Sequence, residues 1–189
     1  MSGADRLEWL SALEHPELLA APVAAALAAW ADREPEVART ARVAEIDPSL
    51  ADTAALTEAY GLDLALSCNC VLVTGRRAGE ERLAAVVVRA TTRADVNNAV
   101  RRLLDVRKAT FLPTERATGE SGMEHGGITP LGVPEGYRVL LDVRVVEGGD
   151  ALLGSGLRRS KLLLPGALLG RLPGAEVHDL ALLPQGVEG

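Results

Sequence analysis

The chain has 189 residues, of which 48% are hydrophobic and 24% charged, a composition typical of one soluble globular domain. No apolar run reaches the roughly 18 residues that a membrane-spanning helix requires, and the acidic N-terminus lacks the basic-then-apolar pattern of a signal peptide. We therefore expect a cytoplasmic protein that does not enter a membrane. Cys68 and Cys70 have no further Cys or His nearby at metal-ligand spacing, so we interpret them as small buried side chains and expect no metal site.

The net charge of −6 is unevenly distributed along the chain. Residues 1–62 hold 11 acidic and 4 basic side chains, whereas residues 63–189 hold 15 acidic and 16 basic ones. A protein that grips a long stretch of nucleic acid has a strong basic excess, and this chain has none. Two local basic groups remain, each interpretable as phosphate contacts or as solvated surface charges: Arg101, Arg102, Arg107 and Lys108, and Arg158, Arg159 and Lys161.

The first third of the chain is predicted to be mainly helical. Leucines recur there at helical spacing, an Ala-rich run follows, and an Asp-Thr pair marks the start of a third helix that a glycine ends. The predicted elements are helices at 4–14, 22–32 and 53–60 and a strand at 41–47. We accordingly distinguish a helical extension (residues 1–40), a main domain (41–183) and a flexible tail (184–189).

Apolar runs bounded by turn residues predict buried strands in the rest of the chain, separated by helices of unequal length. Unequal helices argue against a regular doubly wound sheet. The predicted strands are 64–73, 82–90, 110–112, 137–143, a strand ending at 162–164, and 175–180. The predicted helices are 92–108, 114–118 and 165–172.

The most distinctive segment is residues 126–132, which hold three glycines and a proline. Glycine lets a ligand approach the backbone closely, and Pro130 stiffens the turn. Such a loop can direct bare N–H groups at a carbonyl or a phosphate without any charged side chain. The alternative is an ordinary structural turn between strands.

A second segment, Gly154-Ser155-Gly156-Leu157-Arg158-Arg159-Ser160-Lys161, follows it. Together the two segments resemble the YbaK/prolyl-tRNA-editing family of aminoacyl-tRNA deacylases, which carry a "GGISP-G" loop and then a "VSGG-RG-K" segment. Here Thr129 stands in the Ser place of the first motif. The same order and spacing extend the resemblance over about residues 45–182.

The resemblance implies an α+β fold with a mixed, mostly antiparallel, curved and barrel-like sheet surrounded by helices. It also implies a trans-acting hydrolase that cleaves the ester of a mischarged tRNA, using water and no cofactor, with the tRNA acceptor end and a synthetase as candidate partners. No nucleophile elbow, catalytic triad or Walker loop competes with this reading. The implied catalytic residues are Gly126, Gly127, Ile128, Thr129 and Pro130, and the implied substrate-binding residues are Asn69, His125, Ser155, Gly156, Arg158 and Lys161.

Two departures from the family pattern keep an alternative open. Asn69 stands where many members have a strand lysine that holds the substrate, and Asn97 and Asn98 replace lysines of a later helix. Asparagine supplies hydrogen bonds but no charge. The alternative is a non-catalytic relative that binds an aminoacyl ligand or a synthetase. His125 is likewise either a proton carrier or a hydrogen-bonding residue.

Overall fold

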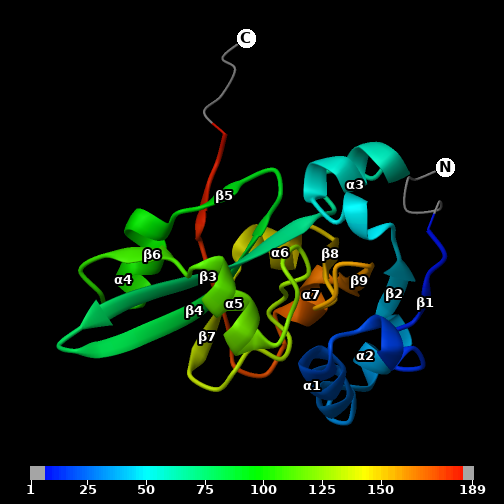
Figure 1. The fold of residues 1–189 in the computed structure, drawn as a ribbon, viewed down its shortest axis with the longest axis horizontal. Helices are drawn as coiled ribbons and strands as arrows, with labels where there is room; N and C mark the ends of the chain where they lie inside the picture. The colour runs from blue at the N-terminus through cyan, green and yellow to red at the C-terminus, as the bar shows by residue number, and fades with distance from the viewer. Residues whose placement is uncertain (1–6, 185–189) are drawn as a thin grey trace.

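The computed structural model describes residues 7–184, which form an α+β domain (Figure 1). The strands are β1 (Leu10–Ser11), β2 (Arg42–Glu45), β3 (Cys68–Arg77), β4 (Glu80–Arg89), β5 (Arg93–Ala94), β6 (Ala109–Phe111), β7 (Tyr137–Asp142), β8 (Asp150–Gly154), β9 (Ser160–Pro165), β10 (Ala175–His178) and β11 (Ala181–Leu182). The α-helices are α1 (Ala21–Ala31), α2 (Pro35–Thr40), α3 (Thr53–Tyr60), α4 (Arg101–Leu103), α5 (Thr114–Ser121), α6 (Val143–Glu147) and α7 (Gly166–Leu169). None of the helices in this part of the chain is long and apolar enough to cross a membrane.

The strands form three separate sheets with the orders β10-β7-β4-β3-β6, β1-β2-β9-β8 and β11-β5. β7 pairs in parallel with both β4 and β10, and the other strand pairs are antiparallel, so the prediction of a mixed, mostly antiparallel fold is confirmed. The barrel-like closure is not confirmed, because the sheets remain open and distinct over residues 7–184.

The β3–β4 hairpin is the centre of the five-stranded sheet. Its turn lies at Ala78 and Gly79, both with positive φ, so the two strands run further than the predicted 64–73 and 82–90. β4 is buried on both faces, as its continuous apolar run predicted: Val86 and Val88 pack in one cluster, and Ala85 and Val87 pack in clusters on the other side. This double burial explains why the strand tolerates no alternation of polar residues.

Arg89, at the end of β4, links the two large sheets. It is 4% exposed, and its guanidinium donates hydrogen bonds to six main-chain carbonyls. The acceptors come from the turn before β3, from α6, and from the turn and first residue of β8: Ala65, Leu66, Arg144, Val145, Gly149 and Asp150. Three of these carbonyls, those of Leu66, Arg144 and Gly149, also accept a main-chain N–H, so the buried cation adds to the main-chain hydrogen bonds that join these segments.

One predicted helix is wrong, and another is confirmed only over residues 96–103. Over the described part of 4–14, Leu10 and Ser11 form β1 and pair with β2, because the leucines pack against the sheet; residues 4–6 lie outside the described residues. Residues 92–108 form β5, a π-helix (Val96–Val100) and α4, and the run ends where Asp105 adopts a φ of 51°. β8 and α6 were not predicted, since five-residue elements leave little periodicity to read.

The other predicted elements are confirmed with shifted ends. α3 stops at Gly61 and α5 at Gly122, and both glycines adopt the left-handed conformation that ends a helix. The N-terminal elements share the main core, since Val23, Leu27 and Trp30 of α1 are buried in the cluster that contains residues of β7, β8 and β9. Of the predicted tail, residues 185–189 lie outside the described residues.

Candidate functional site

A cavity of about 370 Å³ opens between β3, the start of α3, the glycine loop and β9. It brings together five of the predicted site residues, which are distant in sequence: Asn69, His125, Gly126, Ile128 and Lys161. The cavity wall is mixed, with apolar side chains from β3 and from the segment around Leu112. This arrangement suits a small ligand that has one polar end.

The glycine loop presents main-chain donors to this cavity. Gly126 has a φ of 82°, and the Gly127 N–H turns back to the carbonyl of Glu124 at 2.9 Å. The N–H groups of Gly126 and Ile128, which flank it, donate to no acceptor within residues 7–184. Both residues line the cavity, so two main-chain donors without a described acceptor belong to residues of its wall.

The two glycine segments meet backbone to backbone. The Gly156 N–H donates to the Gly127 carbonyl at 2.7 Å, and the Glu124 N–H donates to the Gly156 carbonyl at 2.8 Å. A Cβ on Gly154 would stand 2.2 Å from the Gly127 carbonyl oxygen, and one on Gly127 would stand 2.7 Å from the Leu157 carbonyl. The glycines are therefore required by this contact, which explains why the two motifs occur together.

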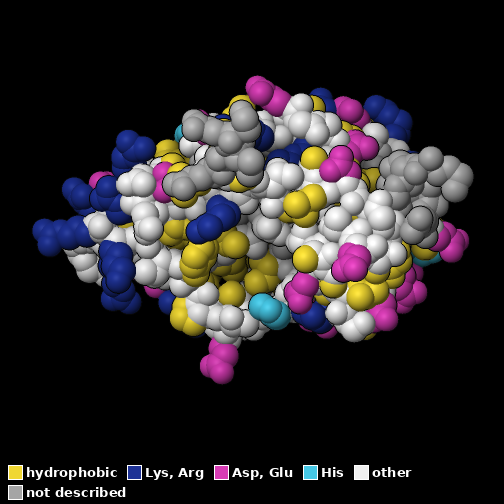
Figure 2. Space-filling model, turned by 90° about the horizontal axis from the view of Figure 1, so that it is seen from above, with side chains coloured by type: hydrophobic (Ala, Val, Ile, Leu, Met, Phe, Trp, Pro, Cys, Tyr) yellow, Lys and Arg dark blue, Asp and Glu magenta, His cyan; other side chains and the backbone are white. Residues whose placement is uncertain are grey.

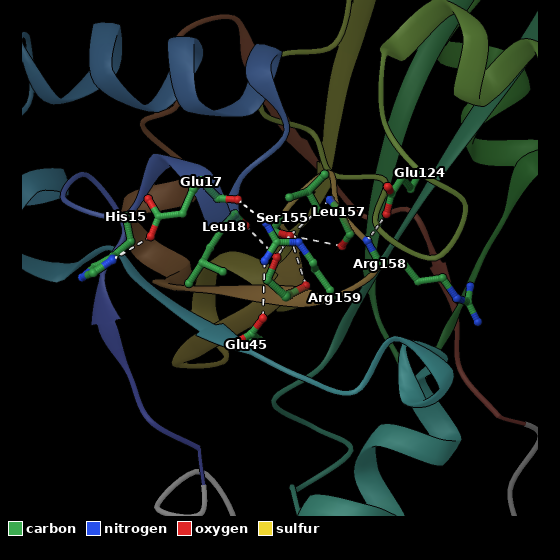
Figure 3. A network of polar contacts seen from close by, with 10 residues as sticks. His15, Glu17, Leu18, Glu45, Glu124, Ser155, Leu157, Arg158 and Arg159 are labelled. Atoms are coloured by element: carbon green, nitrogen blue, oxygen red, sulfur yellow. Dashed lines mark hydrogen bonds and ion pairs between the residues drawn. The ribbon is translucent and has the colours of Figure 1, made fainter.

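Ser155 and Gly156 support this contact from behind and do not line the cavity. Ser155 is fully buried, and its Oγ lies 2.8 Å from Ser160 Oγ, which donates to the Leu18 carbonyl at 2.6 Å (Figure 3). Gly156 packs against α1, since a Cβ there would stand 2.4 Å from the Cβ of Ala20. These contacts hold the loop, and the predicted role of Ser155 and Gly156 in substrate binding stays a prediction.

Arg158 and Arg159 extend in opposite directions (Figure 3). Arg159 donates to the Glu17 carbonyl and pairs with Glu45. Arg158 donates to the His125 carbonyl at 3.1 Å and lies 3.8 Å from the Asp52 carboxylate. Arg158 therefore lies beside the glycine loop, where a Cβ on Gly126 would stand 2.7 Å from its Nη1.

Lys161 supplies a buried ammonium group to the cavity. The residue is 7% exposed, and its Nζ donates to the carbonyls of Ala51 at 2.8 Å and Gly126 at 3.3 Å. Burial lowers the pKa of Lys161 to about 8, with Arg158 acting in the same direction and Asp52 opposing it. An ammonium group has three hydrogens, so these two bonds leave one for a ligand.

The sequence analysis missed two polar residues at the cavity. Thr53 Oγ1 donates to Asn69 Oδ1 at 3.0 Å, which gives Asn69 a partner and fixes its amide at the cavity wall. Asp52 also lines the cavity; it occupies the N-cap position of α3, but its side chain caps no N–H. An Asp-Thr pair is typical of an ordinary helix start, so nothing in the sequence distinguishes residues that begin a helix from residues that also line a cavity.

Thr129 and Pro130 belong to the glycine loop but do not line this cavity. Thr129 is fully buried, and its hydroxyl has no hydrogen-bond partner in the part of the chain that the structure covers. Pro130 lines a different cavity of about 430 Å³ beside Trp30 of α1. These two residues shape the loop, whereas Gly126 and Ile128 face the cavity.

The cavity offers no obvious protein nucleophile. Burial raises the pKa of Cys68 to about 11, partly offset by Arg89, so this thiol stays protonated near neutral pH. No cluster of three His, Cys, Asp or Glu side chains suited to a metal ion occurs in residues 7–184. Besides its apolar residues and the two cysteines, the cavity is lined by the glycine loop at Gly126 and Ile128, by Gly154, by Lys161, and by the polar residues Asp52, Thr53, Asn69, Thr114 and His125.

The fold resembles solved structures of low sequence identity. "Hypothetical protein APE2540" matches with a TM-score of 0.70 and 18% identity over 83% of this chain and 99% of that one. A structure described as "a putative trans-editing enzyme for prolyl tRNA synthetase" matches with a TM-score of 0.67 and 19% identity, over 82% of this chain and 95% of that one. No curated protein matches the chain.

The sequence itself matches a family model. The model of the aminoacyl-tRNA editing domain matches residues 47–172, which include both glycine segments and every side chain that lines the cavity. This span is most of the chain, and it contains the motifs on which the resemblance to the YbaK/prolyl-tRNA-editing family rests. The chain therefore belongs to the aminoacyl-tRNA editing domain family.

Proposed function

We propose that this protein is a trans-acting deacylase that hydrolyses the ester bond of mischarged tRNA. One observation carries the proposal: Gly126 and Ile128, whose N–H groups have no acceptor within residues 7–184, line the same small cavity as the buried Lys161. Donors of this kind stabilise the negative charge that develops on a carbonyl oxygen during acyl transfer. Membership of the editing domain family supplies the substrate class.

In the proposed reaction, water attacks the carbonyl carbon of the aminoacyl ester. The carbonyl oxygen becomes an oxyanion, to which Gly126, Ile128 and Lys161 donate. When the tetrahedral intermediate collapses, the bond to the ribose oxygen breaks, and that oxygen takes the proton that water loses. The products are the free amino acid and uncharged tRNA.

The side chains around the donors set the choice of amino acid. Asn69 is held in place by Thr53, and His125 stands at the cavity beside Gly126. With a volume of about 370 Å³ shared between amino acid and ribose, the cavity favours small side chains. Arg158 and Asp52 form an ion pair at 3.8 Å beside the loop and line the approach to it.

The alternative is a non-catalytic binding protein, and Asn69 is the observation that favours it. Its neutral amide stands where the resembled family has a lysine, and its hydrogen bond to Thr53 is a stable structural arrangement. On this view the cavity holds an aminoacyl group without cleaving it. The acidic N-terminal part would then suit contact with a synthetase.

The test is the release of amino acid from a panel of mischarged tRNAs, including alanine and serine on tRNA-Pro. Gly127→Ala is the loop variant, because its Cβ would meet the Leu157 main chain at 2.7 Å. Gly119→Ala is the matched control, because a Cβ there meets nothing within 4 Å on the exposed surface of α5.

The proposal predicts release by the wild type and by Gly119→Ala, and strongly reduced release by Gly127→Ala that still melts cooperatively. Absence of release from every tRNA, by a folded protein that still binds charged tRNA or a synthetase, would establish the binding-protein alternative.

A further inference from the structure

A second cavity, of about 540 Å³, lies next to the first. Asn69, Val71 and Phe111 line both, so the two cavities meet at the first half of β3. The meeting point exists because β6 pairs with β3 only over Val73–Gly75 and leaves the preceding edge of β3 uncovered by β6. A ligand in the first cavity can therefore continue into the second without crossing the sheet.

Phe111 stands at the boundary between the two cavities. It is the single phenylalanine of the chain and is 61% exposed, slightly more than Leu183 at 60% and more than Leu64, Val177 and Leu182. Nothing in the fold uses the ring, because the core clusters of the described chain do not include it. An exposed aromatic face beside a polar cavity is the kind of platform on which a nucleobase stacks.

The second cavity is also basic. Arg93 and Lys108 line it, and neither forms an ion pair with another residue of the described chain. Asp95 lines it too, but its carboxylate is engaged by the N–H groups of Asn98 and Ala99 at the start of the π-helix. The two cations and one carboxylate give the lining of this cavity a net charge of +1.

The surface around this cavity extends the same charge. Figure 2 shows Lys and Arg side chains gathered at the end of the molecule that carries α4, β6 and the β3–β4 hairpin in Figure 1, with acidic side chains more frequent at the opposite end. Arg101, Arg102 and Arg107 belong to this basic end. A near-neutral domain thus concentrates its positive charge where the second cavity opens.

We propose that the second cavity holds the last unpaired nucleotides of the tRNA, with a base stacked on Phe111 and phosphates bound by Arg93 and Lys108. This proposal rests on the proposed function, since it places the aminoacyl ester in the first cavity and the preceding nucleotides in the second. It assigns the acceptor end to a defined surface and explains how a chain without an overall basic excess binds a polyanion.

The test measures binding of uncharged tRNA and of a short single-stranded RNA ending in CCA, by fluorescence anisotropy. Loss of a base–aromatic stack is worth roughly 1–3 kcal/mol, so Phe111→Ala should weaken binding of both RNAs by about 5- to 150-fold. Leu64→Ala is the control: it also truncates an exposed hydrophobic side chain, but it lies outside both cavities.

Salt dependence tests the phosphate contacts. Each contact to a single strand contributes a slope of about 0.7 in a plot of log affinity against log salt, so Arg93→Gln with Lys108→Gln should reduce the slope by about 1.4. Arg39→Gln, an exposed charge on α2 outside this surface, should leave the slope unchanged.

These outcomes are separate from those of the deacylation assay. Unchanged RNA affinity and salt slope in the Phe111 and Arg93/Lys108 variants would overturn the proposal even if the protein releases amino acids. Weakened RNA binding would support it even if no release occurs, and the proposed hydrolysis alone would then fail.

Discussion

Replacing Lys161 with methionine should abolish most of the hydrolytic activity while changing the stability of the fold very little. Methionine keeps the length and apolar stem of the side chain but removes the ammonium that faces the cavity beside the Gly126 carbonyl. Removing one donor to a developing oxyanion reduces kcat by roughly 100- to 1000-fold in comparable sites. We expect a loss of that order, with a much smaller change in KM.

The small effect on stability follows from two opposing contributions. Lowering the pKa of Lys161 from 10.5 to about 8 corresponds to a cost of about 3 kcal/mol for burying the ammonium, since each pKa unit is worth about 1.4 kcal/mol. The variant removes that cost but leaves the carbonyls of Ala51 and Gly126 without the Lys161 donor, at about 1–3 kcal/mol for each buried acceptor. The free energy of unfolding of Lys161→Met should therefore lie within about 2 kcal/mol of the wild type.

The pH dependence has opposite signs for stability and for activity. Below pH 8 the lysine is protonated in both states, and the folded protein carries the full cost of its burial. Between about pH 8 and 10.5 the unfolded chain binds more protons, so the contribution of Lys161 to the free energy of unfolding rises with pH. Over the same window activity should fall, because the cavity loses its positive charge.

The assay combines single-turnover release of amino acid with urea unfolding, each measured from pH 6.5 to 9.5 and corrected for spontaneous ester hydrolysis. Methionine at position 161 should remove both pH effects relative to the wild type. Full activity in Lys161→Met, or a wild-type rate that does not fall above pH 8 after the correction, would refute the assignment of this ammonium to the reaction.

Two further predictions concern the fold. Arg89→Met leaves six carbonyls without their shared donor and should lower the free energy of unfolding by roughly 3 kcal/mol or more. Arg39→Met on the exposed surface of α2 is the control and should change the free energy of unfolding by less than about 0.5 kcal/mol. Urea unfolding measures both variants, and equal effects would contradict the linking role of Arg89. Gly132→Ala should lower the free energy of unfolding by several kcal/mol, because its Cβ would stand 2.3 Å from the Pro22 carbonyl oxygen at a φ of 76°. Gly136→Ala, whose Cβ would meet nothing within 4 Å, should lower it only by the backbone strain of about 1–2 kcal/mol. Calorimetry distinguishes the two variants, and equal losses would show that the contact of Gly132 with α1 is not tight.

The sequence predicts those elements whose ends are fixed by local chemistry. Gly61 and Gly122 end their helices because each adopts a left-handed conformation that other residues avoid, and this preference needs no knowledge of the rest of the fold. The helix predicted at 4–14 is wrong for the opposite reason. Leu10 recurs at helical spacing but pairs with Val43 of β2, a partner more than thirty positions away that no local window contains.

The structure brings five of the predicted site residues to one cavity, and their roles there stay predictions. Gly126 and Ile128 line the cavity as expected from the loop motif, and Lys161 joins them from β9. Thr53 and Phe111 were missed, because a threonine at a helix start and a phenylalanine in a strand both have ordinary structural explanations. Only the three-dimensional arrangement, which places both residues at one cavity, gives them another role.

The backbone contact between Gly127 and Gly154 has a consequence for how such a site can change over time. The donors that face the cavity beside this contact are main-chain amides, which persist whatever side chains surround them. Residues on the opposite wall, such as Asn69 and Thr53, can be exchanged without moving those donors, because they come from β3 and α3. In the proposed deacylase, recognition of a new amino acid can therefore evolve, or be engineered, by substitutions in β3 and α3 that leave the glycine loop in place.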